Sequence, residues 1–362
     1  MDRPSIDVYE ERAAEWAARR APRTTDHASR FAAAVRSRRR NALIADLGCG
    51  PGWYTGDLGV GPVVAVDGAR AMLDLVPRYA PDAWRVQADL QALPFRRGRF
   101  DAAWASKSYV HLARADLPLA LADLHRSLIP HALAEVVLFR GDMDLGEFAD
   151  DDFSGRRFSL WGEGPLRDVV TGAGFELESL AQRSGKNDGI ELQLQLRRLR
   201  TLPDYIGPKM RLLIVGLNPS LYAADAGTGF ARPGNRFWPA AIEAGLVARD
   251  RDPFDALKQH GVGMTDLAKR ATVRADELAP HEYRDGFARV ERLVAWLQPR
   301  VVCVVGLTGW RTAVDRKAIA GRQPTDLADV PVYVMPNTSG LNARVPISEL
   351  TDHLRAARDL AA

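Results

Sequence analysis

The sequence predicts an α/β protein built from two three-layer α/β/α domains. The chain has 362 residues, about twice the ~150 residues of an average domain. Short uninterrupted apolar runs, typical of strands buried on both faces of a parallel sheet, alternate with helical patterns. Two of these runs, 43–47 and 212–215, lead directly into the glycine turns at Gly48 and Gly216, and each begins its own α/β unit.

Composition and charge are those of an ordinary globular protein. Hydrophobic residues make up 46% of the chain and charged residues 26%, which excludes disorder, collagen-like structure and coiled coil as global descriptions. The net charge of +3 is too balanced to indicate a nucleic-acid partner. Six of the 49 basic residues are lysines, so 43 are arginines. The codon usage of a GC-rich genome explains this excess, and phosphate contact by guanidinium groups is the alternative explanation.

Targeting and cysteine patterns point to the cytoplasm. Residues 1–7 lack a basic segment followed by an apolar one, and no run approaches the ~18 apolar residues that a membrane span needs. The two cysteines, Cys49 and Cys303, lie in separate strand or turn patterns, so neither a disulfide framework nor a metal site is expected.

The first unit, residues 1–198, begins with a helix near 9–21. Residues 175–180 and 190–196 are expected to close the unit as an antiparallel pair, because Gly-Lys-Asn-Asp-Gly lies between them as a hairpin loop. The earlier strands are expected near 43–47, 63–66, 84–88, 100–105 and 134–139, with helices between most of them.

A linker at 199–207 separates this unit from the second one, residues 202–362, because this segment contains Pro203 and Gly207 and lacks periodicity. The second unit repeats the alternation of strands and helices. Phe287, Val290, Val294 and Leu297 recur at helical spacing and are expected to face a sheet. The strands are expected near 212–216, 300–306 and 331–335, and the helices near 281–298 and 347–361.

The first glycine turn, residues 48–52, follows a strand and enters a helix, which lets the backbone approach a nucleoside ligand closely. Asp67 ends the next strand, where a carboxylate can accept hydrogen bonds from ribose hydroxyls. Ala-Asp-Leu at 88–90 and Leu-Pro-Phe at 93–95 follow in order. Over residues 40–195 this set resembles the class I S-adenosylmethionine-dependent methyltransferases, which implies a Rossmann-like methyltransferase fold.

The resemblance implies a cofactor site for S-adenosylmethionine. The methyl acceptor is not readable, because residues 105–109 lack the Asn/Asp-Pro-Pro-aromatic signature of enzymes that methylate base amines; His111 is a candidate base. His131-Ala132 stands where the family usually has a Gly-Gly turn, and the alternative is a Rossmann-like domain that has lost its ligand. By resemblance, Asp46, Gly48, Gly50 and Gly52 line the methionine side of the cofactor, Asp67 binds its ribose, and Asp89 and Leu90 meet its adenine.

The second glycine turn carries Asn218. This residue precedes Pro219 and is therefore pushed into an extended conformation at the carboxyl end of a strand, where open α/β sheets bind ligands. The motifs Gly-Thr-Gly-Phe at 227–230, Pro-Gly-Asn-Arg-Phe-Trp at 233–238 and Asn-Thr-Ser-Gly-Leu at 337–341 follow it. From about Leu202 to the C-terminus this ordered set resembles the mismatch-specific uracil/thymine-DNA glycosylases, which implies a uracil-DNA glycosylase fold.

The resemblance assigns roles in base flipping and hydrolysis. Asn218 holds the attacking water, and Phe230 stacks on the extruded base. Backbone near Leu217 reads the base edge, and Asn235 lies in the same pocket. Ser220 borders the pocket in place of the usual glycine, which could change whether a 5-methyl group is admitted. The loop that inserts into the duplex contains Asn337, Ser339, Gly340, Leu341 and Arg344.

Leu341 is expected to fill the space that the flipped nucleotide leaves, as apolar wedges do in other DNA-bending proteins. The alternative is a loop leucine folded onto the domain surface. Backbone near Gly340 would meet the opposing guanine, and Arg236 and Arg344 are expected at the mouth of the site. A second catalytic residue is Asp266, whose carboxylate could assist the water or stabilise the cationic sugar; an N-cap of a following helix is the alternative.

The two resemblances together predict a DNA repair enzyme. It would excise uracil, and secondarily thymine or modified pyrimidines, from G·U or G·T mismatches, leaving an abasic site with no cofactor or metal for this step, while its N-terminal domain binds S-adenosylmethionine. One alternative is a methyltransferase of a small molecule or RNA with a C-terminal DNA-binding module; the presence of Asn218 argues against it, because binding alone does not need a water-holding amide. A further alternative treats the N-terminal domain as an inactive interaction module. We expect a monomer associated with the nucleoid.

Overall fold

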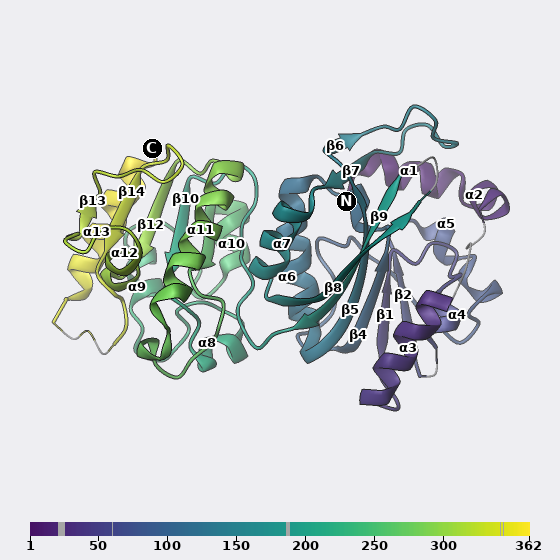
Figure 1. Cartoon of the computed structure of the whole chain (residues 1–362), viewed down its shortest axis with the longest axis horizontal. Helices are drawn as coiled ribbons and strands as arrows, with labels where there is room; N and C mark the ends of the chain where they lie inside the picture. The colour runs from purple at the N-terminus through teal and green to yellow at the C-terminus, as the bar shows by residue number, and fades with distance from the viewer. Residues whose placement is uncertain (21–25, 60, 186–188, 341, 343) are drawn as a thin grey trace. The chain divides into compact units, whose positions relative to one another are not determined.

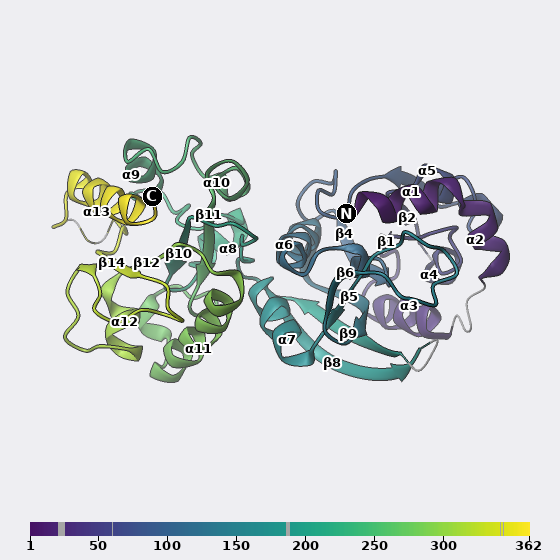
Figure 2. The same ribbon diagram turned by 90° about the horizontal axis from the view of Figure 1, so that it is seen from above.

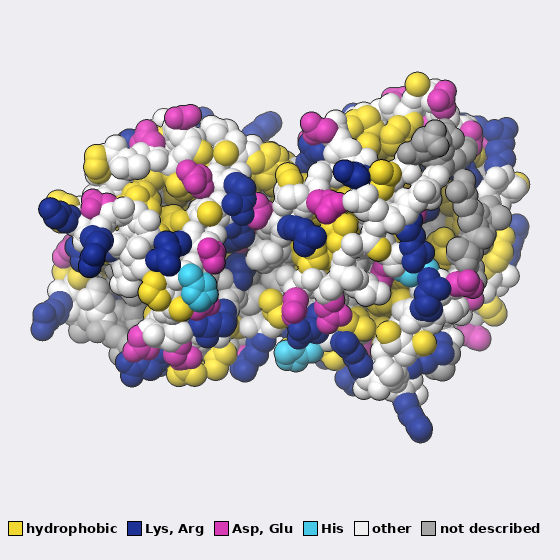
Figure 3. All heavy atoms as spheres, in the orientation of Figure 1, with side chains coloured by type: hydrophobic (Ala, Val, Ile, Leu, Met, Phe, Trp, Pro, Cys, Tyr) yellow, Lys and Arg dark blue, Asp and Glu magenta, His cyan; other side chains and the backbone are white. Residues whose placement is uncertain are grey.

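The computed structural model describes residues 1–20, 26–59, 61–185, 189–340, 342 and 344–362. The chain forms two compact units. The first contains Met1–Thr171 and Phe175–Leu199, and the second contains Gly172–Gly174 and Arg200–Ala362. Among the described residues, no helix combines the length and the apolarity that crossing a membrane requires. On the face drawn in Figure 3, lysine and arginine side chains are interspersed with acidic ones in each unit.

The first unit is built on a mainly parallel sheet with strand order β3-β2-β1-β4-β5-β7-β6, in which β9 pairs with β5 and β8 (Figure 1). The expected antiparallel pair is confirmed, since β8 and β9 run antiparallel. The strands are β1 (Ile44–Leu47), β2 (Val63–Asp67), β3 (Trp84–Gln87), β4 (Phe100–Ser106), β5 (Leu128–Arg140), β6 (Met143–Gly146), β7 (Phe158–Trp161), β8 (Phe175–Ser184) and β9 (Ile190–Arg198).

Helices cover both faces of this sheet, with α6 and α7 on one side and α3 and α4 on the other (Figure 1). The helix expected near 9–21 begins earlier and is divided in two. Asp2 caps its first part by accepting a hydrogen bond from the backbone of Ser5, and Pro4 occupies the first turn. The helices are α1 (Arg3–Glu11), α2 (Ala13–Arg19), α3 (Asp26–Arg38), α4 (Thr55–Leu58), α5 (Arg70–Leu73), α6 (Leu117–Ser127) and α7 (Glu163–Gly172), with 3-10 turns at Val76–Arg78, Tyr109–His111 and Arg114–Asp116.

His131, which replaces the usual glycine of the methyltransferase pattern, lies within β5. It adopts a left-handed conformation with φ 66°, a conformation in which histidine is enriched relative to most other residues that carry a Cβ. The substitution therefore keeps the backbone geometry that a glycine would provide.

The second unit has a sheet of order β11-β10-β12-β14-β13, parallel except for β13. Figure 2 shows α9, α10 and α13 on one face and α11 and α12 on the other. The strands are β10 (Leu212–Gly216), β11 (Val262–Asp266), β12 (Val301–Val305), β13 (Gly321–Arg322) and β14 (Val332–Met335), and the helices are α8 (Leu221–Ala226), α9 (Phe237–Glu243), α10 (Pro253–His260), α11 (Pro280–Leu297), α12 (Leu307–Ala313) and α13 (Ile347–Leu360), with a 3-10 turn at Ala275–Glu277.

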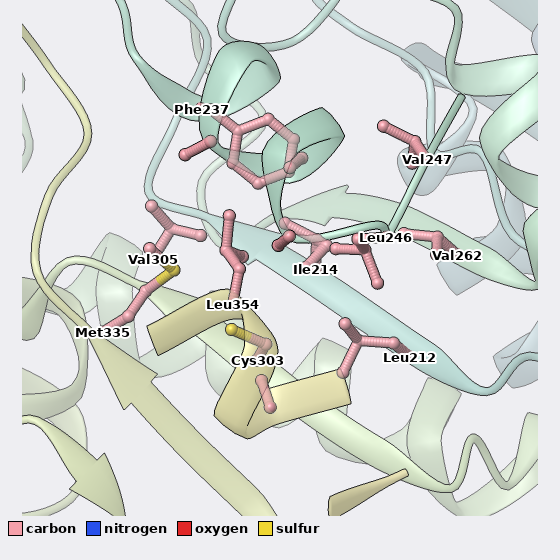
Figure 4. Close-up of a cluster of buried hydrophobic side chains, with 14 of the residues drawn as sticks. Leu212, Ile214, Phe237, Leu246, Val247, Val262, Cys303, Val305, Met335 and Leu354 are labelled. Carbon is pink, nitrogen blue, oxygen red and sulfur yellow. The ribbon is translucent and has the colours of Figure 1, made fainter. Parts of the chain in front are cut away.

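Apolar cores fill both sides of the second sheet. On one side Ile214 and Cys303 of the sheet meet Phe237 of α9 and Leu354 of α13, all fully buried (Figure 4). On the other side α11 presents the four apolar residues whose spacing predicted a buried face, and all four are buried as expected. The sheet is therefore held rigidly, and its carboxyl edge is a firm base for a site.

The segment 199–207, expected to be a linker, is packed rather than free. Leu202 and Ile206 are buried among the apolar core residues, and Tyr205 forms an isolated β-bridge with Met264. Asp204 is 1% exposed and makes ion pairs inside the second unit. This stretch belongs to the fold of the second unit because its buried polar groups find their partners there.

Candidate active sites

Asn218 lies in the turn that follows β10, at the carboxyl end of the sheet. Its Nδ2 donates to the backbone oxygen of Arg270 at 3.0 Å and contacts Oγ1 of Thr272 at 2.8 Å. The backbone oxygen of Pro219 is a third, longer contact at 3.2 Å. Carbonyl oxygens only accept hydrogen bonds, so the NH₂ group must face them, and the amide oxygen Oδ1 remains as an acceptor.

Asp266 is the last residue of β11 and is the register partner of Gly216, two residues before Asn218. A Cβ on Gly216 would collide with Oδ1 of Asp266, so glycine is required where the carboxylate crosses the end of β10. Burial raises the pKa of Asp266 to about 6, while the positive charge of Lys269 opposes the shift. No helix begins directly after Asp266, since residues 267–274 are not helical, so the N-cap interpretation is wrong.

Phe230 lies against the same glycine. Its ring edge lies 3.5 Å from the Cβ position of Gly216, and its ring stacks on Phe237 with centroids 4.2 Å apart and planes at 21°. The backbone of Phe230 is left-handed, with φ 58°, which is a strained conformation for a residue with a large side chain. The Trp238 indole donates to the oxygen of Gly229 at 2.8 Å and fixes this turn.

Ser220 and Asn235, both expected in the base pocket, make local hydrogen bonds at helix starts: Ser220 is the N-cap of α8, and Asn235 lies one residue before Arg236, the N-cap of α9. Ser220 Oγ accepts from the backbone of Ala223 at 3.1 Å at the start of α8. Asn235 Oδ1 accepts from the backbone of Phe237 at 2.9 Å at the start of α9. Leu217 accepts at its carbonyl from the backbone of Ala268 at 3.0 Å, so this oxygen is already bonded within the fold.

We expect Ser220→Ala to lower the free energy of unfolding of the second unit by about 1 kcal/mol, because the substitution removes an N-cap. Ser220→Gly should cost only a few tenths of a kcal/mol, which makes it the matched comparison. Amide hydrogen exchange of α8 measures both. Equal exchange rates of α8 in the parent and Ser220→Ala would contradict the capping role of Ser220.

In the loop expected to insert into the duplex, residues 337–344 (the wedge loop), the described residues contact one another and a neighbouring turn. Asn337 Oδ1 accepts from the backbone of Ser339 at 2.8 Å, and its carbonyl accepts from Asn342 Nδ2 at 3.0 Å. The backbone of Gly340 approaches Gly234 so closely that a Cβ would lie 2.8 Å from the Gly234 oxygen. Arg344 is exposed, and the wedge residue Leu341 lies outside the described residues.

Arg236 anchors the wedge loop. Its Nη2 donates to the carbonyl oxygens of Ser339 at 3.1 Å and Asn342 at 2.8 Å, and its Nη1 donates to that of Val345. The sequence placed Arg236 at the mouth of the site as a basic group; the structure uses the guanidinium to fix the shape of the loop.

A buried polar cluster lies behind Asp266, and the sequence did not indicate it. Asp204 accepts hydrogen bonds from Thr265 at 2.6 Å, Lys269 at 2.8 Å and Arg289 at 2.7 Å. Arg289 also donates to the backbone oxygen of Asp266 at 2.9 Å. These charges keep the pKa of Asp204 below its usual value although burial raises it. The cluster holds the end of β11 and the start of the loop that orients Asn218.

The first unit contains a cavity of about 830 Å³ at its glycine turn, lined by Asp46, Gly48, Gly50 and Asp67 among others. Asp67 accepts from the backbones of Gly50 at 2.8 Å and Ala69 at 2.9 Å, and burial raises its pKa to about 6. Burial also raises the pKa of Asp46 to about 7, although a hydrogen bond from Thr55 opposes the shift.

Three of the expected cofactor contacts do not line this cavity. Leu90 is fully buried, and Gly52 packs against Val76. Asp89 accepts from the amino group of Met1 at 2.8 Å. Met1 itself lines the cavity, and its side chain lies against Gly68, directly after Asp67. The α1 end of the chain thus contacts the edge where the adenine contacts were expected.

Two family models match the chain, one within each of its two units. Residues 203–360 match the model of the uracil DNA glycosylase superfamily, and residues 44–131 match that of a methyltransferase domain.

Several solved structures are similar to the first part of the chain. An S-adenosylmethionine-dependent methyltransferase from Methanosarcina mazei is 16% identical (44% of this chain, 94% of that chain, TM-score 0.41). The 1,6-didemethyltoxoflavin-N1-methyltransferase of Burkholderia thailandensis is 22% identical (48% and 78%, TM-score 0.40). An S-adenosylmethionine-dependent methyltransferase from Mesorhizobium loti is 18% identical (48% and 100%, TM-score 0.37). The chain joins a methyltransferase domain, in its N-terminal unit, to a domain of the uracil DNA glycosylase superfamily, in its C-terminal unit.

Proposed function

We propose that the second unit is a DNA glycosylase that excises uracil from mismatched duplex DNA and leaves an abasic site. The observation that carries this proposal is the fixed amide of Asn218, whose oxygen is left as an acceptor two residues after Gly216, the glycine against which Phe230 and Asp266 both lie. An enzyme that acts on a base in a duplex must first flip the nucleotide out, at a cost of a few kcal/mol that is lower at a mismatch. Phe230, already stacked on Phe237, would support the flipped base.

The proposed chemistry is hydrolysis of the bond between C1′ of the sugar and N1 of the base. As this bond breaks, its electron pair leaves with the base and the sugar becomes cationic. Asn218 Oδ1 accepts a hydrogen bond from a water and orients it toward C1′, where the new C–O bond forms. A neutral amide cannot take the proton of that water, so bond breaking runs ahead of water attack. The Asp266 carboxylate stabilises the cationic sugar and receives the proton.

The wedge loop would enter the duplex, with Leu341 filling the space of the flipped nucleotide. The support for this role is the pair of hydrogen bonds from Arg236 to the carbonyls of Ser339 and Asn342, because an inserted loop must keep its shape against the stacked bases. Uracil opposite guanine is the first substrate, and thymine or modified pyrimidines come second.

Duplexes with a single G·U, A·U or G·T pair, incubated with the protein and then treated with alkali, test the proposal directly. We expect strand breaks at G·U after alkali and none before it, since a monofunctional glycosylase leaves the backbone intact. Absence of an abasic site at G·U contradicts the proposal.

The raised pKa of Asp266 predicts a pH dependence of excision. The carboxylate assists in its ionised form, so the single-turnover rate should be constant above the pKa of about 6 and fall about tenfold per pH unit below it. The Asp266→Asn variant should have a lower single-turnover rate, and that rate should not fall with decreasing pH between pH 8 and 5; in the parent, this fall is the acid limb of the profile. Asp250→Asn, at an exposed position, is the control. A parent profile that stays flat through pH 6 would exclude the ionised carboxylate from the rate-determining step.

We further propose that the first unit binds S-adenosylmethionine, which supplies an electrophilic methyl group when bound. The residues fit this cofactor. Asp67 keeps acceptor capacity for ribose hydroxyls beside the glycine turn, and the buried Ser108 hydroxyl, without a partner in the described chain, lines the cavity at Gly48.

Calorimetric titration with S-adenosylmethionine tests this second proposal. We expect saturable binding by the parent and at least tenfold weaker binding by Asp67→Ala, because two hydrogen bonds to ribose would be lost. Asp57→Ala, at a half-buried position of the neighbouring helix α4 outside the cavity lining, is the control. Equal affinities of the parent and Asp67→Ala contradict the assignment of this carboxylate.

A further inference from the structure

Tyr9 and His111 form a hydrogen-bonded pair on the wall of the first unit's cavity. The Tyr9 hydroxyl lies 2.9 Å from His111 Nε2, and His111 Nδ1 lies 2.7 Å from the carbonyl oxygen of Arg157. Because that carbonyl can only accept, Nδ1 carries the proton of the neutral imidazole and Nε2 accepts from Tyr9. The proton of the phenol is therefore directed at His111.

Arg156 completes this arrangement. Its Nη1 donates to the Tyr9 oxygen at 3.0 Å, and its other nitrogens bind Asp151. The Tyr9 oxygen thus uses its proton and one lone pair within the protein, and one lone pair remains for a ligand. Burial lowers the pKa of His111 to about 4, with Arg156 acting in the same direction and Asp2 and Asp151 opposing it, so Nε2 stays available as an acceptor.

Aromatic rings extend from this pair along the cavity wall. Phe158 lies against His111, with centroids 4.9 Å apart, and against Phe148 at 4.7 Å. On the other side of Tyr9, Trp16 lies at 5.9 Å and also contacts Gly50 of the glycine turn. Rings of this kind bind flat apolar surfaces. The cavity of about 830 Å³ is within the range of small-molecule sites, roughly 300–1,000 Å³.

We infer that the methyl acceptor of the first unit is a small planar aromatic molecule with an ionisable hydroxyl, and that Tyr9 with His111 receives its proton. This inference rests on the proposed methyltransferase function. The acceptor hydroxyl donates to the free lone pair of Tyr9. When its oxygen bonds to the methyl carbon, the methyl–sulfur bond breaks and sulfur keeps the electron pair. The acceptor proton passes to Tyr9 while the Tyr9 proton passes to His111 Nε2.

The charge of the site favours a phenol over an amine. Arg156 lies beside the Tyr9 oxygen and stabilises negative charge there. A protonated amine would instead place a second positive charge next to this guanidinium already on binding, which is unfavourable in a buried site. Transfer between the acceptor oxygen and the Tyr9 oxygen is nearly balanced, because both are phenols, and the free-energy cost of the relay falls on protonation of His111, which burial and Arg156 oppose.

Binding of 7-hydroxycoumarin, a planar phenol, and 7-methoxycoumarin, the same ring system without the proton, tests this inference by fluorescence titration of the full chain in the presence of S-adenosylhomocysteine. We expect both probes to bind saturably to the parent. Tyr9→Phe should weaken binding of 7-hydroxycoumarin about tenfold and change that of 7-methoxycoumarin less than twofold, because only the former uses the lone pair of Tyr9. Tyr79→Phe, which removes a hydroxyl outside the cavity lining, should change neither.

Failure of either probe to bind, or equal effects of Tyr9→Phe on both probes, overturns the inference. Thermal unfolding of each variant shows whether the fold is kept. If Tyr9→Phe does not fold, His111→Gln serves as the second variant, and it should also weaken binding of 7-hydroxycoumarin more than binding of 7-methoxycoumarin. Titration with S-adenosylhomocysteine alone separates the two claims. If it binds and the phenol does not, only the acceptor class is wrong; if it does not bind at all, the proposed methyltransferase function fails.

Discussion

Asn218→Ala is expected to lower the single-turnover rate of uracil excision by about a hundredfold to a thousandfold, the range found when one preorganised hydrogen-bonding group is removed from a transition state. The side chain amide is fixed by Arg270 and Thr272, so its oxygen needs no reorganisation before it orients the water. Alanine removes the acceptor and leaves the Arg270 carbonyl without this donor. Quenched reactions with excess protein over a G·U duplex measure the rate.

Two further variants test whether the orientation of the Asn218 amide matters in addition to its presence. Thr272→Val keeps Asn218 but removes one of its anchors, so we expect a smaller loss, about tenfold. Asn41→Ala, at an exposed asparagine of the first unit, should have no effect. DNA affinity should change little in all three variants, because an oriented water adds nothing to binding of the uncleaved duplex. An Asn218→Ala protein that cleaves like the parent would remove the central claim.

The parts of the fold that could be predicted are those with a strong local signal. The strand at β10 is an unbroken apolar run, and α11 shows its buried face through apolar spacing alone. β11 was missed because Gly263 interrupts its apolar pattern. The structure explains that glycine, since a Cβ there would collide with Met210, but the sequence around residue 263 does not show Met210 nearby.

The site residues that could be predicted are likewise those that lie in a local sequence motif. Asn218, Phe230 and Asp266 were predicted from motifs, and the fold brings Phe230 and Asp266 together at Gly216. Arg236 was expected only as a basic group at the mouth of the site, and Asp204 was not assigned, because their partners are far along the chain: the carbonyls that Arg236 binds lie more than 100 positions away. A linker assignment based on missing periodicity also hid Asp204, whose role depends on three distant side chains rather than on a repeating pattern.

Arg289→Met is expected to destabilise the second unit by up to about 3–5 kcal/mol, the loss found when one partner of a buried ion pair is removed. Asp204 is 1% exposed and would keep only Lys269 and Thr265 as donors. Amide hydrogen exchange of β11 and α11 measures the loss locally, which avoids assuming that the two units unfold together. Arg284→Met, at an exposed position of the same helix, should change stability by less than 0.5 kcal/mol.

A buried ion pair differs from simple packing in how its variants combine. If Arg289 stabilises the fold through Asp204, the double variant Asp204→Asn/Arg289→Met should lose clearly less free energy of unfolding than the two single variants lose together. The reason is that the double variant no longer contains a buried carboxylate that lacks one of its positive partners. Additive losses would show that Arg289 acts independently of Asp204, through its packing and its hydrogen bonds to Thr265 and the Asp266 backbone.

The same cluster should also tune the glycosylase through Asp266. Lys269 and Arg289 lower the pKa of Asp266, while Asp204 raises it. Arg289→Met removes a positive charge and should therefore move the acid limb of the excision profile to higher pH. Asp204→Asn removes a negative charge and should move the limb to lower pH. Loss of structure alone would lower the rate in every variant without shifting the limb in opposite directions, so the sign of the shift distinguishes an electrostatic role of the cluster from a purely structural one.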